Sequence, residues 1–366
     1  MSRLILEIDL QKLEMNARLM KSCLSPGVRM LSVVKADAYG HGSVQVAKML
    51  IEKGLSSDFA VATAEEGACL RKAGIEGNIL ILGCSDEDDM LLAIKHSLIP
   101  TIYSLSHLKA LSYLSKRESK TVKAHLKIET GMNRLGISPG SELIELLSEW
   151  KNTPNVIMDG VFSHFSSADS DKSYTDKQFE IFLSACSLIS DSGFHPIRHI
   201  AASSALYERK YQLDMVRCGI ALYGVGEGPL KDRVFPAQTL KTHPVRIRTA
   251  HLGEKIGYSQ NYTCKKDTVV ATIPCGYGDG YPRHLSNKGF VLVNGRRAPI
   301  IGNICMDMLM IDVTGIGEVN EKSEVVLLGR QEEECITPSE LSDLTDTIPY
   351  EIMLGFTSRA KKTYRI

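Results

Sequence analysis

The stretch VRMLSVVKADAYGHGSVQVAKMLIEKG (residues 28–54) combines the patterns of a strand, a loop and a helix, in that order. Residues 28–35 form a short apolar run with the length of a buried strand. Residues 36–42 contain Asp and Gly, which are typical of turns. From Ser43, a natural helix N-cap, apolar residues recur every three or four positions until Gly54. This stretch therefore predicts one strand–loop–helix unit.

The same alternation continues up to about residue 230. Eight strands alternating with helices is the number found in a TIM barrel, although a doubly wound open sheet has the same local pattern. The count favours an α/β fold that begins with a TIM-type (β/α)8 barrel. The seven further apolar runs are DFAVATA (58–64), NILILG (78–83), LIPTIYS (98–104), VKAHLKIE (122–129), VIMDGVFSH (156–164), FHPIRHIA (194–201) and DMVRCGIALYG (214–224).

The pattern changes after Phe235 and Pro236. Short β-rich runs separated by Gly, Asn, Asp and Pro leave little room for helices until TPSELSDLT (337–345). This predicts a mainly antiparallel β domain that ends with a helical stretch. Since 366 residues exceed what one hydrophobic core usually organises, we predict a barrel over 1–232 and a β domain over 233–366.

Composition excludes several classes of protein. Lys plus Arg equals Asp plus Glu, at 43 each, so the charge balance gives no indication of nucleic acid or an anionic membrane as partner. The opening MSRLILEIDLQKLE carries charges within its apolar run, unlike a signal peptide, and no later run is long enough to span a membrane. The nine cysteines form no C-x-x-C pair, which predicts reduced thiols, no metal site and a cytoplasmic location.

Polar residues interrupt the apolar runs near their carboxyl ends, where a barrel carries its active site. Lys35 is the first of them. Its amine could simply extend into solvent, but the glycines that follow allow close approach of a ligand. A partly desolvated lysine is a nucleophile that can form a Schiff base with an aldehyde. The others are Lys127 with Arg134, His164, Ser203 with Ser204, and Arg217.

At this point the sequence resembles the alanine racemases, the barrel-type class of pyridoxal-phosphate enzymes. The matching segments extend over nearly the whole chain, in the expected order. They are VVKADAYGHG, LKIETGMNRLG, GVFSHF, HIAASSA, MVRCGIALYG, IGYSQNY, IPCGYGDGYPR, GNICMDMLMIDVT and TIPYE.

The resemblance implies two catalytic bases. Lys35 holds pyridoxal 5'-phosphate as a Schiff base and then serves as the base on one face of the substrate α-carbon. Tyr258 matches the family's second base, which reaches the active site of the opposite subunit, so a homodimer with shared active sites is implied. Taken alone, a tyrosine in a β-rich segment is more often a core or rim residue.

Arg217 lies within an almost continuous apolar strand, where an unpaired charge is costly. An ion pair with a carboxylate is one explanation. In the family, the matching arginine faces the pyridine nitrogen, where most pyridoxal enzymes place a carboxylate. The resemblance also implies that His164 packs on the cofactor ring and that His199 bonds the arginine, although either could be an ordinary histidine at a strand end.

The resemblance further implies a set of phosphate contacts. The register within HIAASSA is open between Ser203 and Ser204, because Ala202 stands where many relatives carry Asn; we choose Ser203 by its spacing from His199. The expected contacts come from Tyr39, Ser203, the amides of Gly219 and Ile220, and Tyr350.

Substrate contacts are implied in both domains. Lys127 and Arg134, which alone would be ordinary surface residues, match a pair in which the lysine is often carbamylated and the arginine lies beside the substrate carboxylate. Met306 matches a residue whose backbone amide receives that carboxylate, and Tyr277 matches a tyrosine of the narrow entrance. Cys305 has no activating histidine near it in the sequence and is predicted to be a packing residue.

We therefore predict an isomerase that interconverts L- and D-alanine and supplies D-alanine for cell-wall peptidoglycan. A serine or broad-specificity racemase is the nearest alternative. A barrel-type basic amino-acid decarboxylase shares the architecture but needs a strong electron sink, against which Arg217 argues. A non-catalytic pyridoxal-phosphate-binding protein would leave Tyr258 and Met306 without a role.

Overall fold

The computed structural model describes residues 3–366. Its contacts divide the chain into two compact units. The first, here called the barrel unit, contains residues 14–38 and 42–234. The second, here called the β unit, contains the residues up to Leu13 together with Tyr39–His41 and Phe235–Ile366.

The barrel unit contains a strand in each of the eight predicted runs. The strands form two parallel sheets, in the orders β4-β3-β2-β9 and β5-β6-β7-β8. Parallel bridges join Leu80 to Ile99 and Ala202 to Arg217, so the two sheets connect at both edges and close into a barrel. The predicted (β/α)8 barrel is confirmed and the open sheet is excluded. The strands are β2 (Arg29–Val33), β3 (Asp58–Val61), β4 (Asn78–Ile81), β5 (Thr101–Ile102), β6 (Val122–Lys127), β7 (Val156–Phe162), β8 (Ile197–His199) and β9 (Met215–Cys218).

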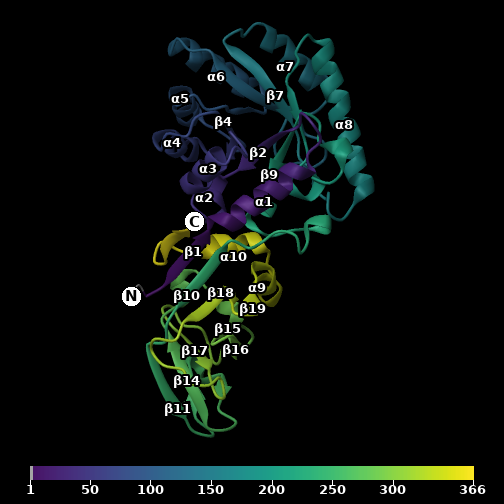
Figure 1. Cartoon of the computed structure of the whole chain (residues 1–366). Coiled ribbons are helices and arrows are strands. Elements are labelled where there is room, and N and C mark those ends of the chain that lie inside the picture. The colour runs from purple at the N-terminus through teal and green to yellow at the C-terminus, as the bar shows by residue number, and fades with distance from the viewer. Residues whose placement is uncertain (1–2) are drawn as a thin grey trace. The chain divides into compact units, whose positions relative to one another are not determined.

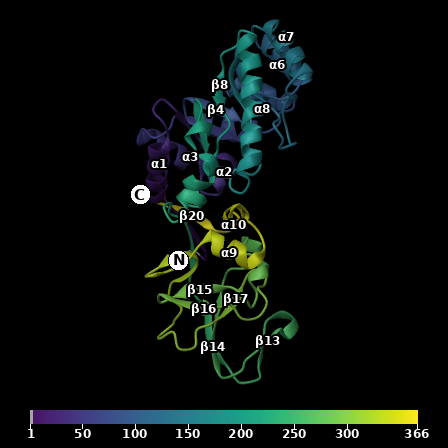
Figure 2. The ribbon, with the colours of Figure 1, turned by 90° about the vertical axis from the view of Figure 1, so that its right-hand side faces the viewer.

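Helices lie on the outside of these strands (Figures 1 and 2). Polar residues fix several of their starts: Thr63, Asp86, Ser104 and Asp171 each accept a hydrogen bond from a backbone N–H of the first turn. Each helix buries one apolar side against the barrel. The helices are α3 (Ser43–Glu52), α4 (Ala64–Lys72), α5 (Glu87–Lys95), α6 (Leu105–Arg117), α7 (Ser141–Lys151) and α8 (Lys172–Asp191), and α1 (Leu10–Cys23) precedes β2. Short 3-10 turns are η1 (Ser203–Ala205), η2 (Arg209–Tyr211), η3 (Ile220–Tyr223) and η4 (Gly228–Leu230).

The turn after Lys35 has an unusual backbone. In α2 (Lys35–Tyr39), Ala36, Asp37 and Ala38 have φ of 51°, 51° and 56°, which is the left-handed helical region. Such a conformation costs an L-residue about 1–2 kcal/mol. Helix α3 begins at Ser43 as predicted, but the prediction of its cap was wrong. Gly42 occupies the N-cap position, and the Asp37 carboxylate accepts the Ser43 N–H at 2.8 Å.

The β unit is mainly antiparallel, as predicted. Its largest sheet has the order β16-β15-β18-β10-β1-β20, with β19 paired to β18, and smaller sheets are β11-β14-β17 and β12-β13. The strands are β1 (Ile5–Asp9), β10 (Gln238–Thr242), β11 (Arg246–Ala250), β12 (Lys255–Ile256), β13 (Tyr262–Thr263), β14 (Thr268–Ile273), β15 (Phe290–Val293), β16 (Arg296–Pro299), β17 (Leu309–Asp312), β18 (Val325–Gln331), β19 (Glu334–Ile336) and β20 (Lys361–Arg365). Helices α9 (Pro338–Thr345) and α10 (Pro349–Gly355) and the 3-10 turns η5 (Tyr258–Gln260), η6 (Tyr277–Asp279) and η7 (Arg283–Leu285) complete the unit.

Strand β1 belongs to the β unit although it begins the chain. It pairs antiparallel with β10 and parallel with β20. The pairing places residues 5–9 with the carboxyl-terminal part of the chain. The predicted domain division at residue 232 assigns them to the barrel instead, and that division remains a prediction. Over residues 3–366, no helix combines the length and apolarity needed to cross a membrane.

Candidate active site

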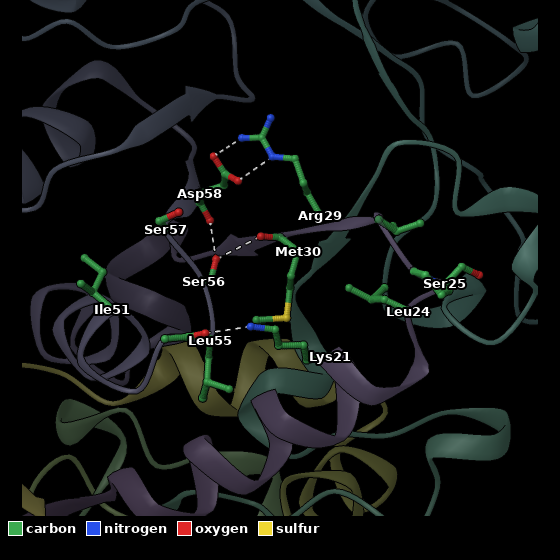
Figure 3. Close-up of a pocket in the computed structure, with 13 residues that line it drawn as sticks. Lys21, Leu24, Ser25, Arg29, Met30, Ile51, Leu55, Ser56, Ser57 and Asp58 are labelled. Carbon is green, nitrogen blue, oxygen red and sulfur yellow. Dashed lines mark hydrogen bonds and ion pairs between the residues drawn. The ribbon is translucent and has the colours of Figure 1, made fainter.

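The barrel unit has one cavity near the amino ends of β2 and β3, with a volume of about 590 Å³ (Figure 3). Its polar groups bond to one another rather than pointing to a common centre. Arg29 forms two hydrogen bonds with the Asp58 carboxylate, at 2.6 and 3.0 Å, and the Ser56 hydroxyl donates to the carbonyl of Met30 or Asp58, both at 3.0 Å. This end of a barrel usually serves stability. These polar groups are paired with one another and offer no set of reactive side chains.

A second cavity, of about 420 Å³, lies at the carboxyl ends of the strands. In this cavity, polar side chains from four separate apolar runs of the sequence come together. No carboxylate is among the residues that line the cavity. This cavity is the candidate active site. Its lining consists of Lys35, Ala62, Leu82, Gly83, Cys84, Lys127, Arg134, Leu135, Phe162, His164 and Arg217.

Arg217, on β9, is 4% exposed. Its Nη1 donates to His199 Nδ1 at 2.9 Å, and its Nη2 donates to His164 Nδ1 at 2.9 Å. Backbone carbonyls of Ser163 and Ile200 accept further bonds at 2.7 and 2.8 Å. Within residues 3–366 no carboxylate forms an ion pair with Arg217, so the ion-pair explanation is wrong. The burial of Arg217 is compensated by neutral acceptors.

The two histidines on Arg217 are neutral. Burial, reinforced by the charge of Arg217, lowers the pKa of His164 to about 2 and lowers that of His199 well below its usual range. Because a guanidinium only donates, Nδ1 of each ring must accept, so each ring carries its proton on Nε2. Arg217 itself keeps its charge near neutral pH, although burial lowers its pKa to about 9.

The charges of Arg134 and Arg217 also act on Lys35 and Lys127. Burial, followed by the charge of Arg134, lowers the pKa of Lys35. Lys127 is 7% exposed, and its Nζ lies 4.4 Å from the centre of the Phe162 ring. Burial, then Arg217 and Arg134, lowers its pKa well below the usual range. Both amines are therefore more readily deprotonated than surface lysines, and the expectation of an ordinary surface residue at Lys127 was wrong.

A group of hydrogen-bond donors lies between η1 and η3. The backbone N–H groups of Gly219 and Ala221 lie 3.1 and 3.5 Å from Ser203 Oγ. Ser203 is buried, whereas Ser204 is exposed. Because both N–H groups donate to the Ser203 hydroxyl oxygen, the geometry favours Ser203 over Ser204 as the residue that faces the start of η3.

Comparison with known proteins covers the whole chain. The family model "Alanine racemase, N-terminal domain" matches residues 8–227, and "Alanine racemase, C-terminal domain" matches residues 237–364. The alanine racemase of Halothermothrix orenii is 40% identical over 98% of this chain and 96% of its own length.

The chain belongs to the alanine racemase family.

Solved structures of this family have the same fold. The Bacillus anthracis alanine racemase with bound L-Ala-P has a TM-score of 0.93 and 33% identity, covering all of this chain and 96% of its own. The Bartonella henselae alanine racemase with covalently bound pyridoxal phosphate has a TM-score of 0.87 and 28% identity, covering both chains completely. The predicted family, its isomerase activity on alanine and its pyridoxal-phosphate cofactor are confirmed at this level.

The barrel-unit residues fit the cofactor of the alanine racemase family. An aldehyde needs an amine with a lowered pKa, which Lys35 provides. A substrate carboxylate needs cationic surroundings, which Arg134 and Arg217 provide in a cavity lined by no acidic side chain. An unprotonated pyridine nitrogen needs a donor that keeps its proton, which Arg217 is.

The β unit brings together the other predicted residues in two places. Tyr258, in η5, is 71% exposed and lines a 460 Å³ cavity with Cys305. The adjacent Met306 is 53% exposed, and its carbonyl accepts the Gly278 N–H at 2.8 Å, beside Tyr277.

The second place in the β unit joins two of the predicted phosphate ligands. The ring centres of Tyr39 and Tyr350 lie 5.8 Å apart. The two residues are far apart in the sequence. Both hydroxyls were predicted to bind the cofactor phosphate. The pairing is consistent with that prediction.

Several residues of the site were not singled out from the sequence. Phe162 lies against both Lys127 and Arg217. The Glu66 carboxylate accepts the N–H of Ala36, in the turn after Lys35, and the N–H of Ala62, directly after β3, at 2.7 Å each. Neither carried a local signal, since a phenylalanine in a strand and a glutamate in a helix are ordinary. The one signal is spacing: Phe162 ends β7 two residues before His164, and alternate residues of an extended chain point the same way.

Proposed function

We propose that this chain interconverts L-alanine and D-alanine by a two-base mechanism in which Lys35 and Tyr258 of the opposite subunit act on the two faces of the substrate α-carbon. Racemisation removes a proton from one face and returns one to the other, so two bases suit the reaction. The lowered pKa of Lys35 supports its role as a base. The high exposure of Tyr258 in its own chain supports a role toward another subunit.

The observation that carries this proposal is the environment of Arg217. When bound, pyridoxal phosphate withdraws electrons from the α-carbon of an attached amino acid and so acidifies its proton. Arg217 would face the pyridine nitrogen as a donor that does not release its proton, and its neutral partners leave it as the only charge at that position. A weaker electron sink disfavours transamination and decarboxylation, which suits a racemase.

The remaining barrel residues bind and orient. His164, held by its hydrogen bond from Arg217, would pack on the cofactor ring. Arg134 lies beside the substrate carboxylate. The phosphate is bound by Ser203, the amides of Gly219 and Ile220, and the hydroxyls of Tyr39 and Tyr350. From the β unit of the partner, the Met306 amide receives the substrate carboxylate and Tyr277 narrows the entrance.

Lys127 is proposed to be carbamylated. Its pKa is lowered well below the usual range, mainly by burial, so the neutral amine, which adds carbon dioxide with release of a proton, forms more readily than on a surface lysine. The product is an anion near Arg134 and Arg217, in a cavity lined by no acidic side chain. A crystallographic density map should show the carboxylate on Lys127. A bare amine, or a chloride ion in its place, would contradict this.

The enzyme is further proposed to be a cytoplasmic homodimer that supplies D-alanine for peptidoglycan. The test of function is chiral chromatography of L-alanine and L-serine, incubated separately with the cofactor-loaded protein. We expect alanine to approach an equal mixture of enantiomers rapidly and serine much more slowly. Equal rates would indicate a broad-specificity racemase. No D-enantiomer from either, despite bound cofactor, would overturn the proposal.

A further inference from the structure

A line of hydrogen-bonding side chains leads from Arg217 away from the active-site cavity. His199 Nε2 and His125 Nδ1 are 3.0 Å apart, and His125 Nε2 is 3.8 Å from Asp159 Oδ2. Arg217 and the two histidines are nearly completely buried in the barrel, where branched apolar side chains are the rule. Neither histidine nor Asp159 lines the cavity.

The chemistry of Arg217 fixes the direction of every bond in this line. Because Arg217 can only donate, His199 Nδ1 accepts and His199 Nε2 carries the proton. That proton is donated to His125 Nδ1, so His125 in turn carries its proton on Nε2. The Nε2–H of His125 points to Asp159 Oδ2. At 3.8 Å this last link is longer than a direct hydrogen bond, and it is an electrostatic contact between the ring N–H and the carboxylate.

The local fold is arranged to accommodate this line. Ala124 pairs with Met158 but His125 pairs with Gly160, so β7 has one extra residue, Asp159, at a bulge. Such bulges re-aim side chains. A Cβ atom at Gly160 would lie 2.4 Å from His125 Cε1, so only glycine leaves room for the ring. The bulge and the glycine thus make places for Asp159 and His125.

We propose that Asp159 and His125, acting through His199, are positioning residues that hold Arg217 in place and balance its charge from a distance. This rests on the proposed role of Arg217 toward the cofactor. The carboxylate stays two rings away from the guanidinium, so Arg217 remains a donor toward the cavity instead of being neutralised by a contact ion pair. The nearby His125 ring, and then Lys123, whose Nζ lies 3.0 Å from Asp159 Oδ1, lower the pKa of Asp159 to about 2, so it is charged at neutral pH.

The first test measures histidine tautomers by nitrogen-15 NMR of the histidine-labelled protein without cofactor. Among the hydrogen bonds of residues 3–366, the bond between His199 and His125 is the one that joins two histidines. A nitrogen–nitrogen coupling across it therefore identifies both rings without substitutions. We expect two neutral rings, each protonated on Nε2. A charged ring, or a proton on His199 Nδ1, would overturn the proposal.

The second test compares variants as cofactor-loaded enzymes. Asp159→Ala should lower kcat about tenfold with KM changed less than about twofold, and should alter the absorbance spectrum of the bound cofactor. Asp159→Asn keeps one acceptor oxygen and should restore most of kcat. Lys123→Ala removes the surface partner of Asp159 but not the acceptor, and is the matched control that should resemble the wild type.

Wild-type tautomers, kcat and spectrum in Asp159→Ala would overturn the proposal. If Asp159→Ala does not fold, Gly160→Ala displaces the His125 ring without changing a polar group and should cause the same loss of kcat. If the wild type lacks racemase activity, the proposed function fails, but the tautomer measurement still reports on the line because it needs no cofactor.

Discussion

At Lys35, burial and the neighbouring Arg134 both disfavour the ammonium form, while the Glu66 carboxylate favours it. The first two effects prevail, so the pKa is lowered. The neutral amine, which attacks an aldehyde, therefore exists at lower pH than it would on the surface. The readiness of this lysine to take up a cofactor is a property of its neighbours.

This predicts a pH shift on removing one neighbour. Arg134→Gln deletes a positive charge near Lys35, so the pKa of Lys35 should rise and the capture of pyridoxal phosphate by the apoprotein should need higher pH. Stopped-flow absorbance across a pH series measures the midpoint. Arg134→Lys retains the charge and should keep the wild-type midpoint. An unchanged midpoint in Arg134→Gln would show that Arg134 does not contribute to the lowered pKa of Lys35.

The second residue-scale prediction concerns Tyr258. Tyr258→Phe removes the hydroxyl proposed to act as a base, and turnover in both directions should fall by about a hundredfold or more. Because Tyr258 is not among the residues of the cofactor cavity, the absorbance of bound cofactor should be retained. Chiral chromatography and the absorbance spectrum measure the two effects. Unchanged turnover would remove Tyr258 from the mechanism.

At the scale of elements, the left-handed turn α2 and helix α3 depend on each other. Residues 36–38 adopt a strained backbone directly after Lys35, and Asp37 within this turn accepts the N–H of Ser43 at the start of α3. Strain of this kind persists only where surrounding structure maintains it, and it is commonly found at functional sites. The start of α3 is one such support.

Asp37→Ala should therefore destabilise the protein. Loss of a side-chain acceptor at a helix start costs about 1 kcal/mol, and Asp37→Asn, which keeps an acceptor oxygen, should recover most of it. Urea unfolding followed by circular dichroism measures the difference. Equal stability of Asp37→Ala and the wild type would mean that the contact at 2.8 Å contributes nothing to folding.

At the scale of the whole molecule, the proposed reaction needs residues from two chains. Lys35 belongs to the barrel unit and Tyr258 to the β unit, and Tyr258, Tyr277 and Met306 are all exposed in the single chain. A cluster of exposed large side chains is typical of an interaction surface. If the active sites are shared, defects in the two units should complement each other between subunits.

Mixing Lys35→Ala with Tyr258→Phe subunits tests this. Random exchange makes half of the dimers hybrids, each with one intact site, so about a quarter of wild-type activity should appear. Each variant alone, treated in the same way, is the control. Activity that never exceeds the average of the two variants would contradict shared active sites.

Much of the fold and of the candidate site could be predicted from the sequence. Strand and helix periodicities are local, so the eight runs were recognisable, and their number indicated the barrel. Lys35, Lys127, Arg134, His164 and Arg217 follow or interrupt those runs, and the topology of parallel strands brings such positions to one end. The family resemblance supplied the cofactor, which periodicity could not.

Other features could not be predicted. The sequence marked Ser43 as a helix cap, but the backbone at Gly42 and the position of Asp37 decided otherwise. It also left open whether Lys127 is a surface residue, because burial depends on which side chains from other strands surround it.

The sequence by itself determined the order and type of the elements and the number of barrel strands, which is eight. It also determined which polar residues stand at the ends of those strands. All of these depend on spacing along the chain. Only the tertiary structure decided the charge states and partners of those residues. Arg217 contacts His199 and, through it, His125 and Asp159, which are separated by 18 to 74 positions along the chain. Hydrogen-bond direction and desolvation depend on distance in space, and the folded barrel alone sets those distances.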